Sequence, residues 1–333
     1  MKLKVLSVFL LIMILLSPIN VNAQDVAVKE ATLFSIDPNS SLASDIAKQL
    51  KMQTGKLDVK RFKDGEIFVK LGEDVTGKDC IIVSTACEEV NTNLMKLLIT
   101  IDALKRNFSA SVIVVVPYLE YARQDRKTAD GEAISAKLVA KLFKIAGADK
   151  IVTMDLHSDQ EEGFFDIPVI NLKGLNIFVD YFKNIIEDPN DFVVVAPDIG
   201  SSKRAREFAK RLGCDSAIVD KHRPKPNKSE VVGLYGNVEG KKAILIDDMV
   251  DTGGTICNAA GFLVEKGARE VYTCATHAVL SGNAVDNINA SPIKQFVFLD
   301  TIAHISKNKD LDKFTFLSSA SMFAETILKL INI

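Results

Sequence analysis

Short runs of apolar and β-branched residues alternate with helix-like segments over most of this chain. Such runs, apolar at consecutive positions, are typical of strands that are buried on both faces of a sheet. Their alternation with helices predicts an α/β fold in which mostly parallel sheets are flanked by helices. The expected strands are 80–85, 111–117, 150–154, 192–196, 216–219, 243–246, 270–273 and 295–298. The expected helices are 93–105, 134–146, 203–212 and 255–266.

The length of 333 residues allows two domains of ordinary size. A strand, a charged loop and a helix at 112–146 have a similar layout to the strand, acidic loop and helix at 243–266. This weak internal similarity fits two similar α/β halves of about 140 residues each. No low-complexity linker separates them, so the two domains should pack closely together.

The charge balance and the cysteines narrow the possible ligands. The formal net charge of -2 provides no overall field for nucleic acid or a membrane surface, so a site for an anion must be local. The five cysteines are an odd number and show no CxxC spacing. We interpret them as reduced thiols and not as a disulfide framework or a zinc site.

The first 23 residues differ from the rest of the chain. Lys2 and Lys4 precede an apolar run at 5–16, and small residues follow near Ala23. These features are typical of a secretory signal peptide, and the apolar run is too short for a comfortable membrane span. A spurious upstream start and a membrane-tethered extension are the alternatives. We leave residues 1–23 out of the fold and expect no stable membrane span in the mature chain.

The stretch KKAILIDDMVDTGGT at 241–255 combines acids with a loop suited to an anion. We expect a buried strand that ends at Ile246, and ligands of open α/β sheets bind beyond the carboxyl ends of strands. Glycines let backbone N–H groups approach a phosphate, threonines add hydroxyl donors, and the next helix points its positive end there. The residues of this loop are Asp251, Thr252, Gly253, Gly254 and Thr255.

Asp247 and Asp248 precede this loop and would repel a phosphate. We therefore expect them further along the ligand, where they accept hydrogen bonds from sugar hydroxyls. Ribose 5-phosphate has this layout, with a phosphate at one end and a diol at the other. A solvated acidic turn with a helix cap is the simpler alternative, but it does not explain two adjacent acids before TGGT on a strand–loop–helix unit.

The stretch resembles the phosphoribosyl diphosphate binding motif of the type I phosphoribosyltransferases and the ribose-phosphate diphosphokinases (phosphoribosyl pyrophosphate synthetases). Other motifs decide between these families, and the chain resembles the synthetases from about Thr32 to Leu330. The matching stretches are RFKDGEIFV at 61, NTNLMKLLITIDALKR at 91, YARQDRK at 121, ISAKLVAKL at 134, TMDLHSDQ at 153, GFFDIPV at 163, PDIG at 197, DKHRPKPN at 220 and THAVLSG at 276. This ordered set is far more specific than the loop motif alone.

The resemblance implies two phosphoribosyltransferase-type domains, at 30–170 and 171–315, and a C-terminal helix at 316–333 that packs back on the first domain. It also implies transfer of the diphosphoryl group of ATP to the C1 hydroxyl of ribose 5-phosphate. The products are AMP and phosphoribosyl diphosphate, which feeds nucleotide biosynthesis. The alternatives are a phosphoribosyltransferase and a catalytically silent regulatory paralogue.

The stretch DKHRPKPNKSE at 220–230 is polar and basic, and its prolines prevent a helix. Taken alone, it is most simply an exposed basic loop. The resemblance instead implies that Lys221 and Arg223 close over the substrates and stabilise the transferring group. Arg223 would also reach ribose 5-phosphate.

His157 follows an expected strand and, taken alone, is most simply a structural histidine. The resemblance assigns His157, with Asp198 of PDIG, to a site for Mg²⁺ and ATP. Because Mg²⁺ prefers oxygen ligands and keeps several waters, His157 would act partly through water or by contacting ATP itself.

The resemblance assigns other residues to ATP alone. Phe62 would stack on adenine, and Asp64, Gly65 and Glu66 share its tight turn. Arg123 and Gln124 would contact the nucleotide phosphates and ribose. A surface hairpin and a basic turn are the simpler alternatives. In the family this hairpin reaches the ATP site of a neighbouring subunit, which implies a homo-oligomer, a hexamer built from dimers.

The chain departs from the family pattern at several positions. Glu161 and Glu162 stand where apolar or amide residues are usual. Thr76 and Gly131 stand where allosteric members carry arginines of a regulatory site for phosphate or ADP. The substrates ATP and ribose 5-phosphate favour a cytoplasmic location, whereas residues 1–23 favour a secretory route or an organelle.

Overall fold

The computed structural model of this chain describes residues 30–85, 87, 89–225, 228–303 and 311–331. The signal-peptide-like segment at 1–23 lies outside the described residues, so that interpretation stays a prediction. Within the described part of the chain, no helix has both the length and the apolar character needed to cross a membrane.

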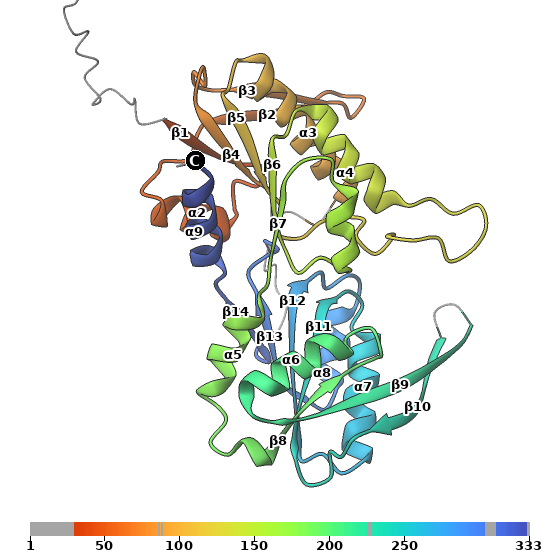
Figure 1. The fold of residues 1–333 in the computed structure, drawn as a ribbon. Helices are drawn as coiled ribbons and strands as arrows, with labels where there is room; N and C mark the ends of the chain where they lie inside the picture. The colour runs from red at the N-terminus through yellow and green to blue at the C-terminus, as the bar shows by residue number, and fades with distance from the viewer. Residues whose placement is uncertain (1–29, 86, 88, 226–227, 304–310, 332–333) are drawn as a thin grey trace, which may run out of the picture.

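A five-stranded parallel sheet, in the order β1-β4-β5-β6-β7, forms the N-terminal domain (Figure 1). Its strands are β1 (Ala31–Ser35), β4 (Asp79–Val83), β5 (Ser111–Val115), β6 (Lys150–Met154) and β7 (Val169–Leu172). Its helices are α2 (Ser41–Gln49), α3 (Val90–Arg106), α4 (Ser135–Ala146) and the 3₁₀ turn η1 (Asp159–Phe164). An antiparallel hairpin of β2 (Leu57–Arg61) and β3 (Ile67–Leu71) stands apart from this sheet.

A seven-stranded sheet, in the order β10-β9-β8-β11-β12-β13-β14, forms the C-terminal domain, and β10 is its antiparallel strand. Its strands are β8 (Phe192–Ala196), β9 (Asp215–Lys225), β10 (Lys228–Tyr235), β11 (Lys242–Val250), β12 (Glu270–Ala278), β13 (Ile293–Leu299) and β14 (Phe314–Leu317). Its helices are α5 (Leu175–Lys183), η2 (Pro189–Asp191), α6 (Ser202–Leu212), α7 (Gly254–Glu265) and α8 (Ala284–Ala290). The predicted α/β class, with two mostly parallel sheets flanked by helices, is confirmed.

The two sheets have similar strand orders, and in each of them a polar loop follows the carboxyl end of a central strand. β5 is third in its sheet counted from β1, and β11 is third counted from β9. Each is followed by a polar loop and then a helix, α4 or α7. Because ligands in such sheets bind beyond the carboxyl ends of strands, both loops lie where a site is expected.

One hydrophobic core runs through both domains. It joins residues of the first sheet, such as Val115 and Val152, to Phe182 of α5 and to Val194 and Ile246 of the second sheet. These strands are buried on both faces, which explains their uninterrupted apolar sequences. A shared core limits independent motion of the two domains.

The C-terminal helix α9 (Ala320–Ile331) leaves the second domain and lies beside α2 of the first (Figure 1). Phe323 and Ile327 of α9 belong to the same buried core as Leu42 and Ile46 of α2. The expected domain boundary at residue 170 falls inside β7, whose pairing with β6 extends to Leu172.

Two expected elements were placed wrongly. The strand expected to end at Ile246 continues to Val250, because β12 keeps pairing with β11 as far as Ala278. Asp247 and Asp248 therefore lie in the strand and not in the loop.

Within the stretch 220–230, expected as a polar loop, residues 220–225 lie in β9 and residues 228–230 lie in β10. β8 pairs with β9 only up to Ile218, so the rest of β9 has β10 as its partner. A proline such as Pro224 is tolerated there, because among the described residues this part of β9 pairs along one edge only.

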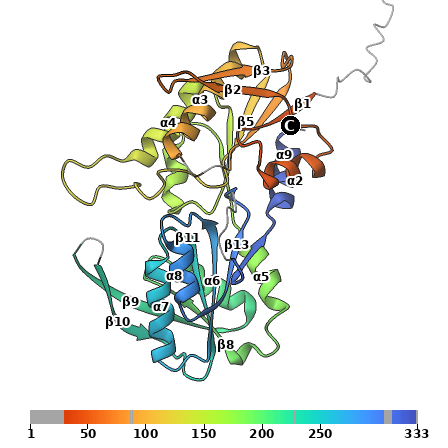
Figure 2. The ribbon, with the colours of Figure 1, turned by 180° about the vertical axis from the view of Figure 1, so that it is seen from behind.

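The ribbon and the loop between β5 and α4 extend from the same side of the molecule. Figures 1 and 2 show both of them reaching outward, one from each domain. The loop carries Arg123 and Gln124, and the ribbon carries Lys221 and Arg223. The fold thus brings catalytic and nucleotide-binding candidates to one side of the junction between the domains.

Candidate active site

His157 and Asp248 meet across the junction of the two domains. His157 follows β6, Asp248 lies near the end of β11, and the His157 Nδ1 atom donates to Asp248 Oδ2 over 2.7 Å. This hydrogen bond raises the pKa of His157. Burial opposes ionisation of Asp248, but the hydrogen bond from His157 and the charge of Arg204 lower its pKa. The structure therefore favours a charged pair at this point.

Arg123 and Asp251 form a second contact between the domains. The guanidinium Nη1 of Arg123, on the loop after β5, donates to Asp251 Oδ2 over 2.5 Å. A residue predicted to bind ATP thus touches a residue of the predicted phosphate loop. The two predicted substrate sites are neighbours across the domain junction.

Asp247 and Asp198 are linked through Ser201, which no sequence pattern singled out. The Ser201 hydroxyl donates to Asp247 Oδ1 over 2.7 Å, and the Ser201 backbone N–H donates to Asp198 Oδ1 over 3.2 Å. Burial, with the negative charges of Asp248 and Asp198, raises the pKa of Asp247. The group carries an excess of negative charge that a cation would relieve.

The predicted phosphate loop has the expected geometry. Gly253 has a φ of +77°, a left-handed conformation that favours glycine, and α7 begins at the next residue, Gly254. Thr255 is the second residue of α7, and Asp251 and Thr252 precede Gly253. Backbone N–H groups at the start of a helix have no partner within the helix and can bind an anion, so this geometry permits the phosphate site, which stays a prediction.

Other predicted site residues lie elsewhere. Phe62 is 56% exposed at the tip of the β2–β3 hairpin, and the same turn holds Asp64, Gly65 and Glu66. Figures 1 and 2 show this hairpin at the end of the N-terminal domain that faces away from the C-terminal domain. Within one chain, the structure does not bring these four residues to His157 and Asp248.

Gln124 is anchored next to Arg123. Its side-chain Oε1 accepts from the Ser135 hydroxyl over 2.6 Å, at the start of α4. The anchor ties the loop after β5 to the helix that follows it and fixes the backbone beside Arg123.

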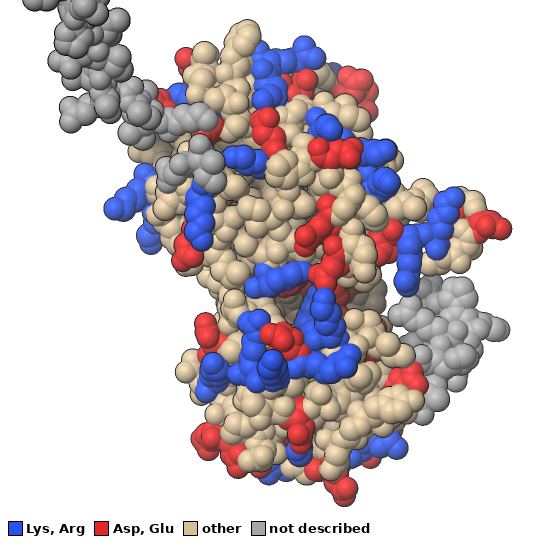
Figure 3. Space-filling view, in the orientation of Figure 1, with Lys and Arg blue, Asp and Glu red and all other residues tan. Residues whose placement is uncertain are grey.

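Basic side chains gather in one area of the surface (Figure 3), although the net charge of the chain is small. Figure 3 shows Lys and Arg side chains gathered at the waist of the molecule, with acidic side chains among them. Helix α6 is rich in basic residues and carries Lys203, Arg204, Arg206, Lys210 and Arg211. Arg204 acts on the buried acids, because its charge helps to lower the pKa of Asp248.

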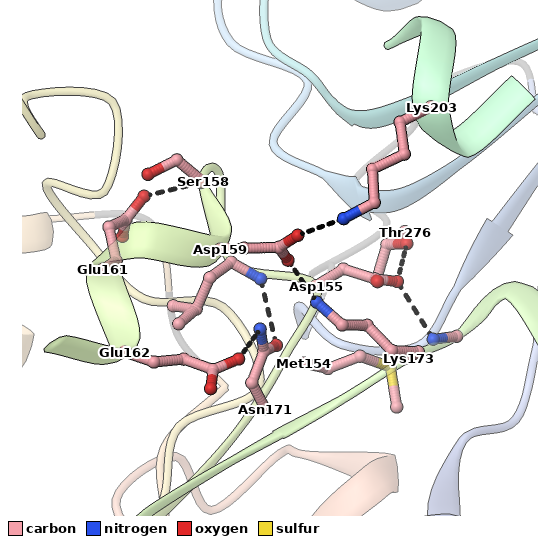
Figure 4. A network of polar contacts seen from close by, with 12 residues as sticks. Met154, Asp155, Ser158, Asp159, Glu161, Glu162, Asn171, Lys173, Lys203 and Thr276 are labelled. Atoms are coloured by element: carbon pink, nitrogen blue, oxygen red, sulfur yellow. Dashed lines mark hydrogen bonds and ion pairs between the residues drawn. The ribbon is translucent and has the colours of Figure 1, made fainter. Parts of the chain in front are cut away.

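The two unusual acids of η1 fix the turn around His157. Glu161 is fully buried, and its Oε1 accepts from the Ser158 N–H over 2.8 Å. Glu162 Oε1 accepts from the Asn171 amide, and Asn171 Oδ1 accepts from the Leu156 N–H (Figure 4). The backbone on both sides of His157 is thus held.

Glu120, in the loop after β5, is a buried acid that the sequence patterns did not mark. It is 2% exposed, and its Oε2 has no hydrogen-bond partner among the described residues. Burial raises the pKa of Glu120 to about 7. An acid with a raised pKa in the folded state destabilises the fold increasingly as pH rises from its unfolded value to its folded value.

We expect Glu120→Gln to stabilise the protein at pH 8 by about 1–3 kcal/mol and to have little effect near pH 4. Chemical denaturation from pH 4 to 9 measures this difference, with Glu187→Gln as the control for loss of an exposed charge. A constant difference between wild type and Glu120→Gln across this range would contradict the assignment.

Comparison with known proteins places the chain. The family model described as the N-terminal domain of ribose phosphate pyrophosphokinase matches residues 31–147, and the phosphoribosyl synthetase-associated domain matches 215–333. The ribose-phosphate pyrophosphokinase of Clostridium tetani is 50% identical over 303 residues, which is 91% of this chain and 94% of that protein. This chain belongs to the ribose-phosphate pyrophosphokinase family.

Other family members support the assignment. The ribose-phosphate pyrophosphokinase of Bacillus subtilis is 46% identical over 90% of this chain and 94% of its own length. The crystal structure of phosphoribosylpyrophosphate synthetase from Mycobacterium smegmatis superposes with a TM-score of 0.85 at 38% identity, over 91% of this chain and 99% of that chain. The family and the fold predicted from the sequence are confirmed.

Proposed function

We propose that this chain is a ribose-phosphate pyrophosphokinase. It transfers the diphosphoryl group of ATP to the C1 hydroxyl of ribose 5-phosphate and releases AMP and phosphoribosyl diphosphate. One observation carries the proposal: the sequence matches this family over about nine-tenths of the chain, with both motif-bearing domains present. The contacts of His157 with Asp248 and of Arg123 with Asp251 support a site at the domain junction.

Ribose 5-phosphate binds at the carboxyl end of β11 in this proposal. Its phosphate lies against the Thr252–Thr255 segment and the start of α7, where backbone N–H groups and hydroxyls donate. Its diol lies against Asp247 and Asp248, whose carboxylates accept hydrogen bonds. The division follows from charge, because the acids repel the phosphate and the loop attracts it.

ATP binds on the side of the first domain, near Arg123, Gln124 and His157. The reaction displaces AMP from the β-phosphorus of ATP, so it depends on charge neutralisation and alignment more than on a covalent intermediate. We infer that Lys221 and Arg223, on the β9–β10 ribbon, approach the transferring group from the same side as the loop that carries Arg123.

Mg²⁺ is the proposed cofactor and arrives with ATP. Among the described residues, no three His, Cys, Asp or Glu side chains form a group that would hold a metal alone. The carboxylate of Asp198, which Ser201 holds beside Asp247, fits an ion that keeps substrate oxygens and waters as its other ligands. Bound with ATP, the ion neutralises phosphate charge; Asp198 and His157 orient that assembly.

We propose a homo-oligomer, a hexamer built from dimers, in which neighbouring subunits share an ATP site. The exposed ring of Phe62, at a hairpin remote from His157 in its own chain, supports sharing.

We assign no nucleic-acid partner, consistent with the net charge of -2. For location, we propose the cytoplasm, where both substrates are available. Mass spectrometry of the native N-terminus tests it, and a mature end at Gln24 in an extracellular fraction would contradict it.

An assay of purified protein for AMP separates the candidate functions. AMP formation that requires both ribose 5-phosphate and Mg–ATP supports the proposed enzyme. A silent regulatory paralogue would form none alone but would alter the activity of an added active relative. A phosphoribosyltransferase would consume phosphoribosyl diphosphate without making AMP from ATP.

We expect activity with little requirement for free phosphate. The Thr76 hydroxyl donates to Asp74 over 2.7 Å, and Gly131 has no side chain, so neither replaces an arginine that would bind an oxyanion. Lys78 and Lys127 are the nearby basic residues that could compensate in part, and Lys78 pairs with Glu30. A phosphate titration at fixed Mg–ATP and ribose 5-phosphate checks this, and a steep sigmoidal rise from near zero would refute it. ADP should inhibit mainly in competition with ATP.

A further inference from the structure

Buried polar side chains join the end of β12 to the end of β6, beside the turn that carries His157. Asp155 comes from the first domain, and Thr276, His277 and Thr301 come from the second. All four are buried, with exposed fractions from 0% to 5%. Buried polar groups are costly unless they are paired, so their contacts define the geometry closely.

One carboxylate oxygen of Asp155 receives two of these contacts. The Thr276 hydroxyl donates to Asp155 Oδ2 over 2.6 Å, and the Gly174 N–H donates to the same atom over 3.0 Å. Figure 4 shows the Asp155 side chain directed at Thr276, with both contacts drawn. Asp155 is thereby tied to β12 and to the start of α5.

The preceding residue is held as well. The His277 Nε2 atom donates to the backbone carbonyl of Met154 over 3.0 Å. The His277 Nδ1 atom lies 3.0 Å from the Thr301 hydroxyl, which fixes the ring. The last residue of β6 and the residue after it are therefore both fixed by the second domain.

Asp155 has a strained backbone that these contacts hold in place. Its φ is +42°, in the left-handed region that residues other than glycine rarely adopt. Such a conformation persists only where the surroundings enforce it, and it redirects the chain at that point. Two residues later the chain presents His157 to Asp248.

We propose that Thr276 is a positioning residue for the transfer reaction. Its hydroxyl, through Asp155, holds the strained turn that places the His157 ring against Asp248. The inference rests on the proposed function, in which His157 orients Mg–ATP and Asp248 binds ribose 5-phosphate. Thr276 itself touches neither substrate in this arrangement, so it acts through Asp155 and the turn.

The experiment compares substitutions on one strand. Thr276→Val removes the hydroxyl and keeps the shape, whereas Thr276→Ser keeps the hydroxyl. Thr276→Ala is a second hydroxyl-free variant, in case valine does not fold. Thr273→Val is the matched control: Thr273 is fully buried in β12, and its hydroxyl has no hydrogen-bond partner among the described residues.

We expect Thr276→Val to lower turnover by about tenfold, with a smaller change in KM for ribose 5-phosphate. Thr276→Ser and Thr273→Val should stay within about twofold of wild type. In the ligand-free protein, hydrogen–deuterium exchange should be faster in Thr276→Val at 155–158 and at Gly174, and unchanged in Thr273→Val.

Equal turnover in Thr276→Val and Thr273→Val would overturn the inference. An equal loss of turnover in Thr276→Val, Thr276→Ser and Thr273→Val would overturn it as well. If wild type and Thr273→Val both fail to form AMP, the proposed function is wrong. The exchange measurement then decides the inference alone: unchanged exchange at 155–158 in Thr276→Val overturns the positioning role, and faster exchange supports it.

Discussion

Replacing Lys221 by alanine is expected to lower turnover by about 100- to 1000-fold while ATP binding stays nearly intact. The β9–β10 ribbon that carries Lys221 extends beyond the sheet, and among the described residues no third strand pairs with it there. In the proposal, Lys221 meets the transferring diphosphoryl group as charge shifts during displacement. An interaction that strengthens only in the transition state affects turnover and not ground-state affinity.

Steady-state kinetics and calorimetric titration with Mg–ATP measure the two quantities separately. Lys228→Ala, on β10 of the same ribbon, is the matched control for loss of a positive charge, and it should have a much smaller effect. A loss of ATP affinity with unchanged turnover in Lys221→Ala would assign Lys221 to ground-state binding.

The sequence predicted strands well where burial alone determines them. The ranges 150–154 and 192–196 agree with β6 and β8, because each is centred on buried apolar residues. The ends of β9, β11 and β12 were placed too early. Those strands continue into polar residues because a neighbouring strand supplies hydrogen bonds, which local apolarity does not reveal.

The candidate site was predictable in its local part. The loop from Asp251 to Thr255 is one continuous segment, and its left-handed Gly253 and the start of α7 are features of local sequence. The partners of its residues come from far along the chain: His157 meets Asp248, and Arg123 meets Asp251. No periodicity encodes such contacts, because they depend on how the two sheets pack.

Ser201 and Thr276 show more clearly which contacts sequence patterns cannot predict. Each is a small hydroxyl residue that local patterns do not distinguish from a surface serine or threonine. Ser201 links Asp198 to Asp247, and Thr276 binds Asp155. The stretch THAVLSG, noted for its resemblance to the family, was the available signal for Thr276, and its role follows only from the domain junction.

The second large effect is expected at the ribose 5-phosphate site. Asp247→Ala and Thr255→Ala should each weaken ribose 5-phosphate binding by about five- to a hundredfold, because each removes a hydrogen bond worth roughly 1–3 kcal/mol. In the proposal, Asp247→Ala removes a diol acceptor, whose carboxylate also accepts from the Ser201 hydroxyl and from the Asp248 backbone N–H. Thr255→Ala removes a hydroxyl from the first turn of α7, where the phosphate binds in the proposal.

Ribose without its phosphate distinguishes the two roles. It should bind poorly to wild type, be weakened further by Asp247→Ala and be little affected by Thr255→Ala, since Thr255 would have no phosphate to contact. Asn258→Ala, at an exposed position of the same helix, is the control for a general effect on α7. Binding of ribose and of ribose 5-phosphate is measured by titration calorimetry on each variant. If Thr255→Ala weakened both ligands equally, the acids and the loop would not divide the ligand between diol and phosphate, and the charge argument for this site would fail.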